Sequence, residues 1–259
     1  MSAAVALDWV LRRDRAVVLT ALGVATLLAW AYLLVGAGMD MPAGDVTAPM
    51  AWTPGSVGVM FVMWAVMMVA MMLPSAAPMI LLFATIDRRR AAASGTPYRA
   101  TALFALAYVA VWMGFSGAAT AAQWGLDRAR LLSPAMASSS AVLAGLLFMA
   151  GGLYQFTPLK QACLRQCRSP LDFLTGHWRA GALGAFRMGL RHGLFCVGCC
   201  WAVMALLFVG GLMNMVWIAA LALFVLLEKT APAGGPLGRA AGVGLILWGG
   251  ATLIAAAAG

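Results

Sequence analysis

The chain has 259 residues, of which 64% are hydrophobic and only 10% are charged. A soluble domain of this size needs more charge to cover its surface, so the composition excludes an ordinary globular enzyme domain. The net charge of +9 would suit nucleic acid, but the basic residues lie between long apolar blocks, where they set membrane orientation instead. We therefore expect a polytopic membrane protein with no nucleic-acid partner.

Seven apolar segments are predicted to cross the bilayer as helices. A spanning helix needs about 20 apolar residues for a hydrocarbon layer of roughly 30 Å, and it satisfies its own backbone hydrogen bonds there. The predicted spans are residues 16–37, 57–83, 101–123, 139–158, 188–210, 212–228 and 240–258. The fifth and sixth share one uncharged stretch, so a re-entrant hairpin over 188–228 would leave six. The fold class is an all-α membrane helix bundle that forms one domain over 1–259.

The distribution of basic residues predicts the orientation of this bundle. Arg12, Arg13 and Arg15 precede a first apolar run that is longer than the 7 to about 15 residues of a signal peptide, so we interpret it as a retained anchor. With the N-terminus in the cytoplasm, fifteen of the 17 Lys and Arg residues lie inside, and only Arg128 and Arg130 lie outside. This positive-inside bias predicts a multi-pass protein of the cell's inner (cytoplasmic) membrane, surrounded by the lipid bilayer.

Methionine is over-represented, with 18 residues, and it concentrates in the second span. On a helix, Met67 and Met71 fall on one face and Met68 and Met72 on the adjacent one, so thioethers line about half of the surface. Thioether sulfur is a soft, uncharged ligand that suits Cu(I). Methionine also fills gaps in apolar cores, so a packing face beside Trp64 is the alternative.

The loop ahead of the second span adds further soft and acidic side chains. Because it is predicted to lie outside the membrane, these groups would collect a soft cation at the outer surface. They are Met39, Asp40, Met41, Asp45 and Met50.

Three cysteines and a histidine share the fifth span. His192, Cys196 and Cys200 follow one another at four-residue steps, and Cys199 lies on a neighbouring part of the same face. Thiolates and imidazole are the ligands of thiophilic metals, so this Cys-x-x-Cys-Cys pattern predicts a site for Cu(I), or for Zn(II) as an alternative. Structural packing of small apolar thiols stays open as well.

A second cysteine pair, Cys163 and Cys167, is predicted in the inner loop after the fourth span, where the basic neighbours Lys160, Arg165 and Arg168 would favour thiolates. We expect all five cysteines to converge near the inner surface as metal ligands or reactive thiols, because a reducing cytoplasm disfavours disulfides.

The charged pair between the sixth and seventh spans is not predicted to bind a metal. Glu228 and Lys229 follow the apolar run of the sixth span, and we interpret them as ordinary interface residues.

Three motifs resemble a known family. They are Trp64-Ala-Val-Met-Met-Val-Ala-Met-Met-Leu-Pro-Ser, the stretch from Tyr154 to Pro170, and His192-Gly-Leu-Phe-Cys-Val-Gly-Cys-Cys-Trp. Together, over residues 55–230, they resemble a bacterial domain-of-unknown-function family described as predicted metal-binding integral membrane proteins. The resemblance implies the membrane fold and metal binding.

The leading functional hypothesis is a Cu(I)-handling membrane protein that transports or delivers the ion through methionine, cysteine and histidine ligands. We expect a metal ion and a membrane or periplasmic protein as partners, and a transporter or delivery site rather than an enzyme. The sequence contains no phosphate-binding loop, nucleophile elbow or dinucleotide motif. One alternative is a membrane thiol–disulfide oxidoreductase that uses Cys163 and Cys167 with Cys196 and Cys199. Another is a structural or assembly subunit of a membrane complex.

Overall fold

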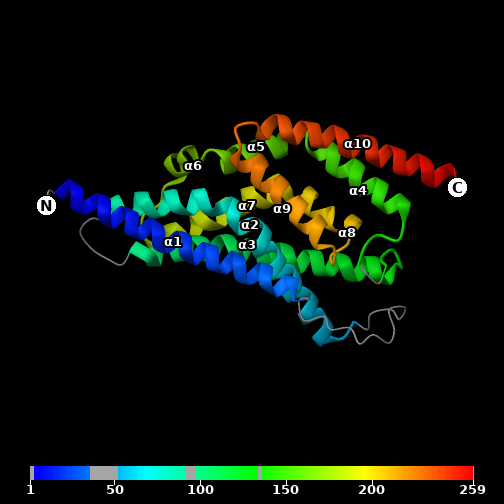
Figure 1. Ribbon diagram of the computed structural model, residues 1–259, viewed down its shortest axis with the longest axis horizontal. Helices are drawn as coiled ribbons and strands as arrows, with labels where there is room; N and C mark the ends of the chain where they lie inside the picture. Colours follow the sequence, from blue (N-terminus) through cyan, green and yellow to red (C-terminus); the bar gives the residue numbers. More distant parts are fainter. Residues whose placement is uncertain (1–2, 36–51, 91–96, 134–135, 259) are drawn as a thin grey trace.

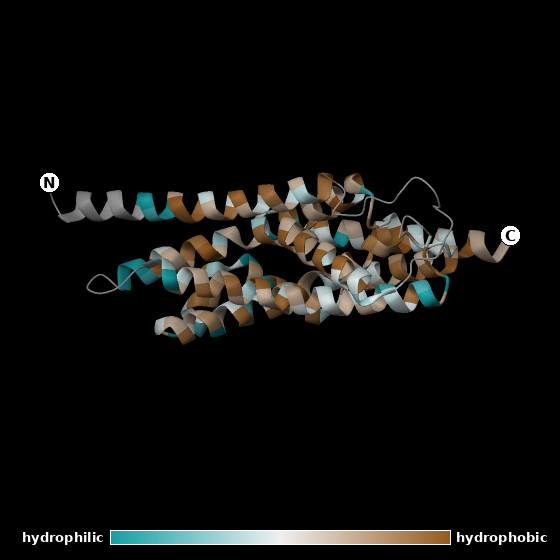
Figure 2. Ribbon diagram, turned by 90° about the horizontal axis from the view of Figure 1, so that it is seen from below, coloured by the Kyte–Doolittle hydropathy of each residue, from teal (hydrophilic) through white to brown (hydrophobic). Residues whose placement is uncertain are grey.

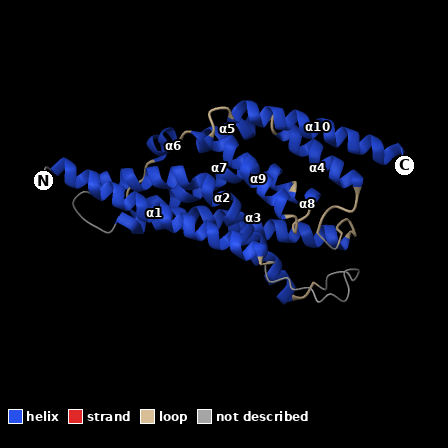
Figure 3. Cartoon of the chain, viewed as in Figure 1, coloured by secondary structure: helices blue, strands red, loops and turns tan. Residues whose placement is uncertain are grey.

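The computed structural model describes residues 3–35, 52–90, 97–133 and 136–258, and these residues form helices joined by short segments (Figures 1 and 3). Apart from one isolated bridge between Leu132 and Ser138, the described ranges contain no extended pairing. The helices are α1 (Ala3–Leu34), α2 (Pro54–Arg90), α3 (Pro97–Arg128), α4 (Ala141–Tyr154), α5 (Pro158–Arg168), α6 (Pro170–His177), α7 (Gly181–Ala205), α8 (Leu207–Gly210), α9 (Met215–Thr230) and α10 (Gly234–Ala258).

The long helices lie side by side along the longest axis of the molecule (Figure 1). Helix α1 packs on α2, α2 on α3, and α3 on α7, while α4 and α10 form a second antiparallel pair. Hydrophobic residues dominate these helices (Figure 2), as expected for elements that meet lipid on one side and each other on the other.

Five segments are long and apolar enough to cross a membrane, and a sixth exists if the bent pair α4 and α5 counts as one span. The five are Arg12–Leu34, Pro54–Arg90, Tyr98–Arg128, Gly181–Gly210 and Gly234–Ala258. The predicted sixth span corresponds to α9, whose 16 residues extend only roughly 24 Å, less than a full hydrocarbon layer. The all-helical fold is thus confirmed, with five or six candidate membrane spans, whereas the count of seven and the orientation stay predictions.

The predicted inner loop over 159–187 is largely helical instead. Thr157 caps α5 by accepting a hydrogen bond from the Lys160 amide, and Pro158 occupies the first turn, where its missing N–H costs nothing. The buried residues of α5 recur at three- and four-residue steps, which is the pattern of an amphipathic helix. They are Lys160, Cys163, Leu164 and Cys167. The axes of α4 and α5 differ by 65° across the break.

Glycines bring two helix pairs into backbone contact. A Cβ at Gly193 would lie 2.9 Å from the Val111 side chain, and one at Gly189 would meet the Phe104 carbonyl, so these two glycines, four residues apart, let α7 approach α3 closely. In the other pair, a Cβ at Gly152 of α4 would lie 2.8 Å from the Gly242 carbonyl of α10. The close α3–α7 contact determines which α3 side chains lie beside the α7 cysteines.

Candidate metal centre

The methionine stripe of α2 faces the interior of the bundle. Seven methionines of this helix are at most 2% exposed: Met60, Met63, Met67, Met68, Met71, Met72 and Met79. At one end of the stripe, Gln123 of α3 donates to the Sδ atoms of Met60 (3.4 Å) and Met136 (3.0 Å) while it accepts from the Trp64 indole (2.8 Å). The thioethers are therefore positioned within a packed core rather than turned toward lipid.

The two cysteine groups meet where α5 packs on α7. The Sγ atoms of Cys167 and Cys199 lie 4.0 Å apart, and the Cys199 and Cys200 thiols donate to the Cys196 carbonyl at 3.1 and 2.9 Å. Cys163 approaches α7 at Gly198, where its Sγ lies 2.7 Å from the position that a Cβ would take. All five cysteines are buried and free. The predicted convergence of the thiols is present, while their position near the inner surface stays a prediction.

One methionine of the stripe reaches this thiol group. The Cys200 Sγ lies 3.8 Å from the Met72 Sδ, and the Tyr108 hydroxyl of α3 donates to the Met72 carbonyl at 3.1 Å. The same hydroxyl lies 3.1 Å from the Cys196 Sγ. The neighbouring Met67, Met68 and Met71 are equally buried, but among the described residues Met72 is the methionine within hydrogen-bonding distance of a thiol. Helices α2, α3 and α7 thus meet at one sulfur-rich point.

A buried lysine completes this point. The Lys229 Nζ donates to the Cys196 Sγ at 2.9 Å and to the Ser75 Oγ at 3.2 Å, and the lysine is only 5% exposed. Within the described ranges, no carboxylate lies within ion-pair distance of its ammonium group. The neighbouring Glu228, 1% exposed, pairs instead with Lys160 at 2.7 Å.

The interpretation of Glu228 and Lys229 as interface residues is therefore wrong. The physical reason is that α9 is short and its end lies against α5 inside the bundle. Arg168 of α5 donates to the carbonyls of Glu228, Ala231 and Pro232, which fixes the turn between α9 and α10 there. One feature pointed to the burial of this charged pair: the apolar helix beside it has 16 residues, which is too short to reach both membrane surfaces.

Two of the three basic side chains expected to favour thiolates at Cys163 and Cys167, Lys160 and Arg168, are engaged elsewhere. The Lys160 ammonium binds Glu228 and the Gln155 side chain, and Arg168 binds backbone carbonyls. Among the described residues, the positive group that donates to a thiol is Lys229, from a helix that we did not associate with the cysteines.

His192 lies one turn from the thiols and packs among aromatic rings. Its ring stacks on Tyr108 with centroids 5.5 Å apart and meets Phe173 edge-on at 5.4 Å, and its Nδ1 atom has no hydrogen-bond partner in the described part of the chain. Among the described residues, no group of three or more His, Cys, Asp or Glu side chains is arranged to hold a metal ion. The outer-loop residues Met39, Asp40, Met41, Asp45 and Met50 lie outside the described residues.

Fold and centre together define a helical membrane protein with a buried cluster of thiols, one thioether and one ammonium group. The matching family model is described as copper chaperone (PpoB2), and it matches residues 61–252. Because this match covers most of the chain, the protein belongs to the PpoB2 copper chaperone family, which agrees with the metal-related membrane family that the motifs resemble. No curated protein and no solved structure matches the chain.

Proposed function

We propose that this protein is a membrane copper chaperone that holds Cu(I) as cargo between α2 and α7 and delivers it to an acceptor protein in or outside the membrane. The family description supports a copper-related role and gives no support to the Zn(II) alternative. Soft thiolate and thioether donors are the ligands that Cu(I) prefers, and the centre offers both. The protein binds and transfers an ion and performs no bond chemistry of its own.

The observation that carries the proposal is the contact between the Cys200 thiol and the Met72 thioether, with Cys196 beside them. Two sulfurs that each lie about 2.3 Å from one metal ion are themselves separated by roughly 4 Å, which is close to the 3.8 Å found here. Cys196, Cys200 and Met72 are thus the proposed primary ligands. Cys199 and Cys167, whose thiols are 4.0 Å apart, offer an adjacent position.

The remaining predicted ligands have places in a route through the same core. Met67, Met68 and Met71 lie along α2 toward the end of the bundle that holds Gln123, and Cys163 lies beside the thiols on α5. His192, with its unpartnered Nδ1 one turn from Cys196, is the proposed exit on the other side. Each step moves the ion between neighbouring soft donors without burying an uncompensated anion.

Lys229 supplies the charge balance of the proposed site. Cu(I) held by two thiolates carries one net negative charge, which is costly inside a membrane unless a cation lies beside it. The Lys229 ammonium lies 2.9 Å from Cys196 and has no carboxylate within ion-pair distance in the described ranges. A divalent ion on the same two thiolates would leave a net positive charge, so Lys229 favours a monovalent cargo.

The proposed topology keeps seven membrane-inserted helices, with α9 ending inside the bundle, and a cytoplasmic N-terminus in the inner membrane. Its support is the clustering of Arg residues on the N-terminal part of α1, the C-terminal part of α2 and the start of α7, against Arg128 and Arg130 near the other end.

The test is Cu(I) affinity of the purified protein in mild detergent, measured by competition with a chromophoric Cu(I) chelator. The double variant Cys196→Ser with Cys200→Ser should lose about 100-fold or more in affinity, because two of three donors disappear. Cys163→Ser, whose thiol packs at Gly198, should lose far less. Unchanged affinity in a folded double variant would refute the site.

A second function is favoured by the 4.0 Å separation of the Cys167 and Cys199 sulfurs. In this function the two thiols form a disulfide and pass two electrons and two protons to the disulfide of a partner protein, which becomes a dithiol. Thiol trapping in cells decides between them. A Cys167–Cys199 disulfide that comes and goes supports exchange chemistry, and fully reduced cysteines under oxidising and reducing growth conditions exclude it.

A further inference from the structure

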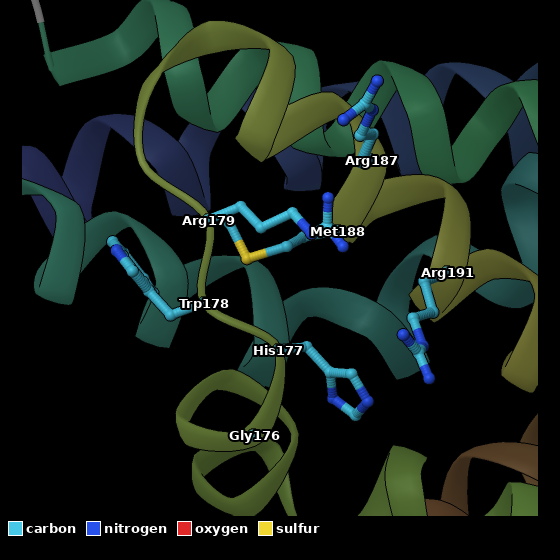
Figure 4. Close-up of a pocket in the computed structure, with 7 residues that line it drawn as sticks. All are labelled: Gly176, His177, Trp178, Arg179, Arg187, Met188 and Arg191. Carbon is cyan, nitrogen blue, oxygen red and sulfur yellow. The ribbon is translucent and has the colours of Figure 1, made fainter.

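A basic cavity lies at the N-terminal end of α7, away from the sulfur centre. It has a volume of about 370 Å³ and is lined by His177 and Trp178 at the end of α6, by Arg179 in the connecting segment, and by Arg187, Met188 and Arg191 of α7 (Figure 4). Arg187 and Arg191 are one helical turn apart, so both side chains start from the same face of α7. The cavity has no part in the proposed copper site.

The positive charge of this cavity has no compensating carboxylate among the described residues. In the described part of the chain, none of its three arginines has a carboxylate within ion-pair distance. Arg191 lies over the Phe195 ring at 5.8 Å, and the cavity residue Trp178 has Arg90 of α2 over its ring at 4.5 Å. Three arginines that line one cavity, with the Arg90 guanidinium over the ring of a lining residue, indicate an anionic ligand.

The surroundings indicate the kind of anion. Leu183 (62% exposed) and Leu194 (63% exposed) flank the two α7 arginines at four- and three-residue steps, so they lie on the same exposed face. A soluble anion gains nothing from contact with these exposed leucines, whereas the acyl chains of a lipid pack against them. Trp178 is also typical of the membrane interface.

We propose that this cavity binds the phosphate group of an anionic membrane lipid, with the acyl chains along the exposed face of α7. The planar guanidinium fork matches phosphate oxygens bidentately, and basic pockets between membrane helices suit lipid head groups. The bound head group would connect Arg179, in the segment after α6, to Arg187 and Arg191, and so hold this segment against α7. The site is independent of copper binding.

The test is the apparent melting temperature of the full-length protein, delipidated in mild detergent. Phosphatidylglycerol should raise it by about 5 °C near saturation, whereas phosphatidylcholine should not. The variant with Arg179→Gln, Arg187→Gln and Arg191→Gln should lose the shift. The control with Arg128→Gln and Arg130→Gln, at the other end of the bundle, should keep it. Replacing the three cavity arginines with lysine should give an intermediate shift, because charge stays and the fork is lost.

Each other outcome has a defined meaning. Equal shifts with phosphatidylcholine, or a full shift in the triple glutamine variant, would overturn the site. The same shift with millimolar inorganic phosphate alone would keep phosphate recognition but overturn a lipid as its source. If the triple variant does not fold, the single Arg187→Gln change is used, and phosphatidylglycerol retained by the protein is counted by native mass spectrometry. Retention equal to that of the unaltered chain would also refute the proposal.

Discussion

Two buried lysines of this protein have opposite kinds of partners. Lys160 binds the Glu228 carboxylate at 2.7 Å, and the Gln155 side chain also accepts from it. Lys229, the residue after Glu228, contacts the Cys196 thiol and the Ser75 hydroxyl instead. The first lysine is neutralised by a fixed anion. The second contacts a thiol, which loses its proton and becomes a thiolate when a thiophilic ion binds. Lys160 therefore has a structural role, whereas the Lys229 charge can balance the charge of a bound metal ion.

The largest effect is expected from breaking the structural pair. Lys160→Met leaves the Glu228 carboxylate buried and unpaired, which should cost about 3–5 kcal/mol and lower the apparent melting temperature strongly. Adding Glu228→Gln should restore much of the loss, because no charge then stays buried. Thermal unfolding of both variants measures this. A stable single variant would show that Glu228 is not held by Lys160.

Lys229→Met should have the opposite profile. Its cost in stability is expected to be only about 1–2 kcal/mol, since two hydrogen bonds are lost but no carboxylate is left unpaired. The ratio of Cu(I) to Zn(II) affinity should fall by about tenfold or more, because the charge balance then favours the divalent ion. Chelator competition for both metals gives the ratio. Lys229→Arg, which keeps the charge, should preserve it, and an unchanged ratio in Lys229→Met would remove the proposed role.

The smallest effect is expected at the thioether. Met72→Leu preserves volume and should change stability by less than about 1.5 kcal/mol, while Cu(I) affinity should fall several-fold because one soft donor is lost. Met213→Leu, in the exposed segment between α8 and α9, is the matched control and should change neither quantity. If Met72→Leu binds Cu(I) as the unaltered chain does, the stripe only packs.

Periodicity along single helices could be predicted from the sequence, and contacts between helices could not. The uncharged blocks and the four-residue spacing of the α2 methionines and α7 cysteines are properties of one helix, so they needed no knowledge of neighbours. Lys160 and Glu228 lie 68 positions apart, and their pairing depends on where the short α9 ends. Hydropathy alone places such a pair at the membrane surface.

His192 and α5 also show where interpretation of the sequence reaches its limit. The position of His192 one turn before Cys196 suggested that it is a ligand. Its ring is instead surrounded by aromatic rings of α3 and α6, which come from elsewhere in the chain. The helix α5, in contrast, had a readable start in Thr157 and Pro158, and the basic composition of the segment obscured it.

The contact between Cys163 and Gly198 restricts which residues can occupy these two positions together. Because the thiol occupies the space of a side chain on α7, a residue larger than glycine at 198 requires a smaller one at 163 or a displaced α5. We therefore expect the two positions to vary together among relatives, with glycine at 198 wherever 163 carries a side chain the size of cysteine or larger.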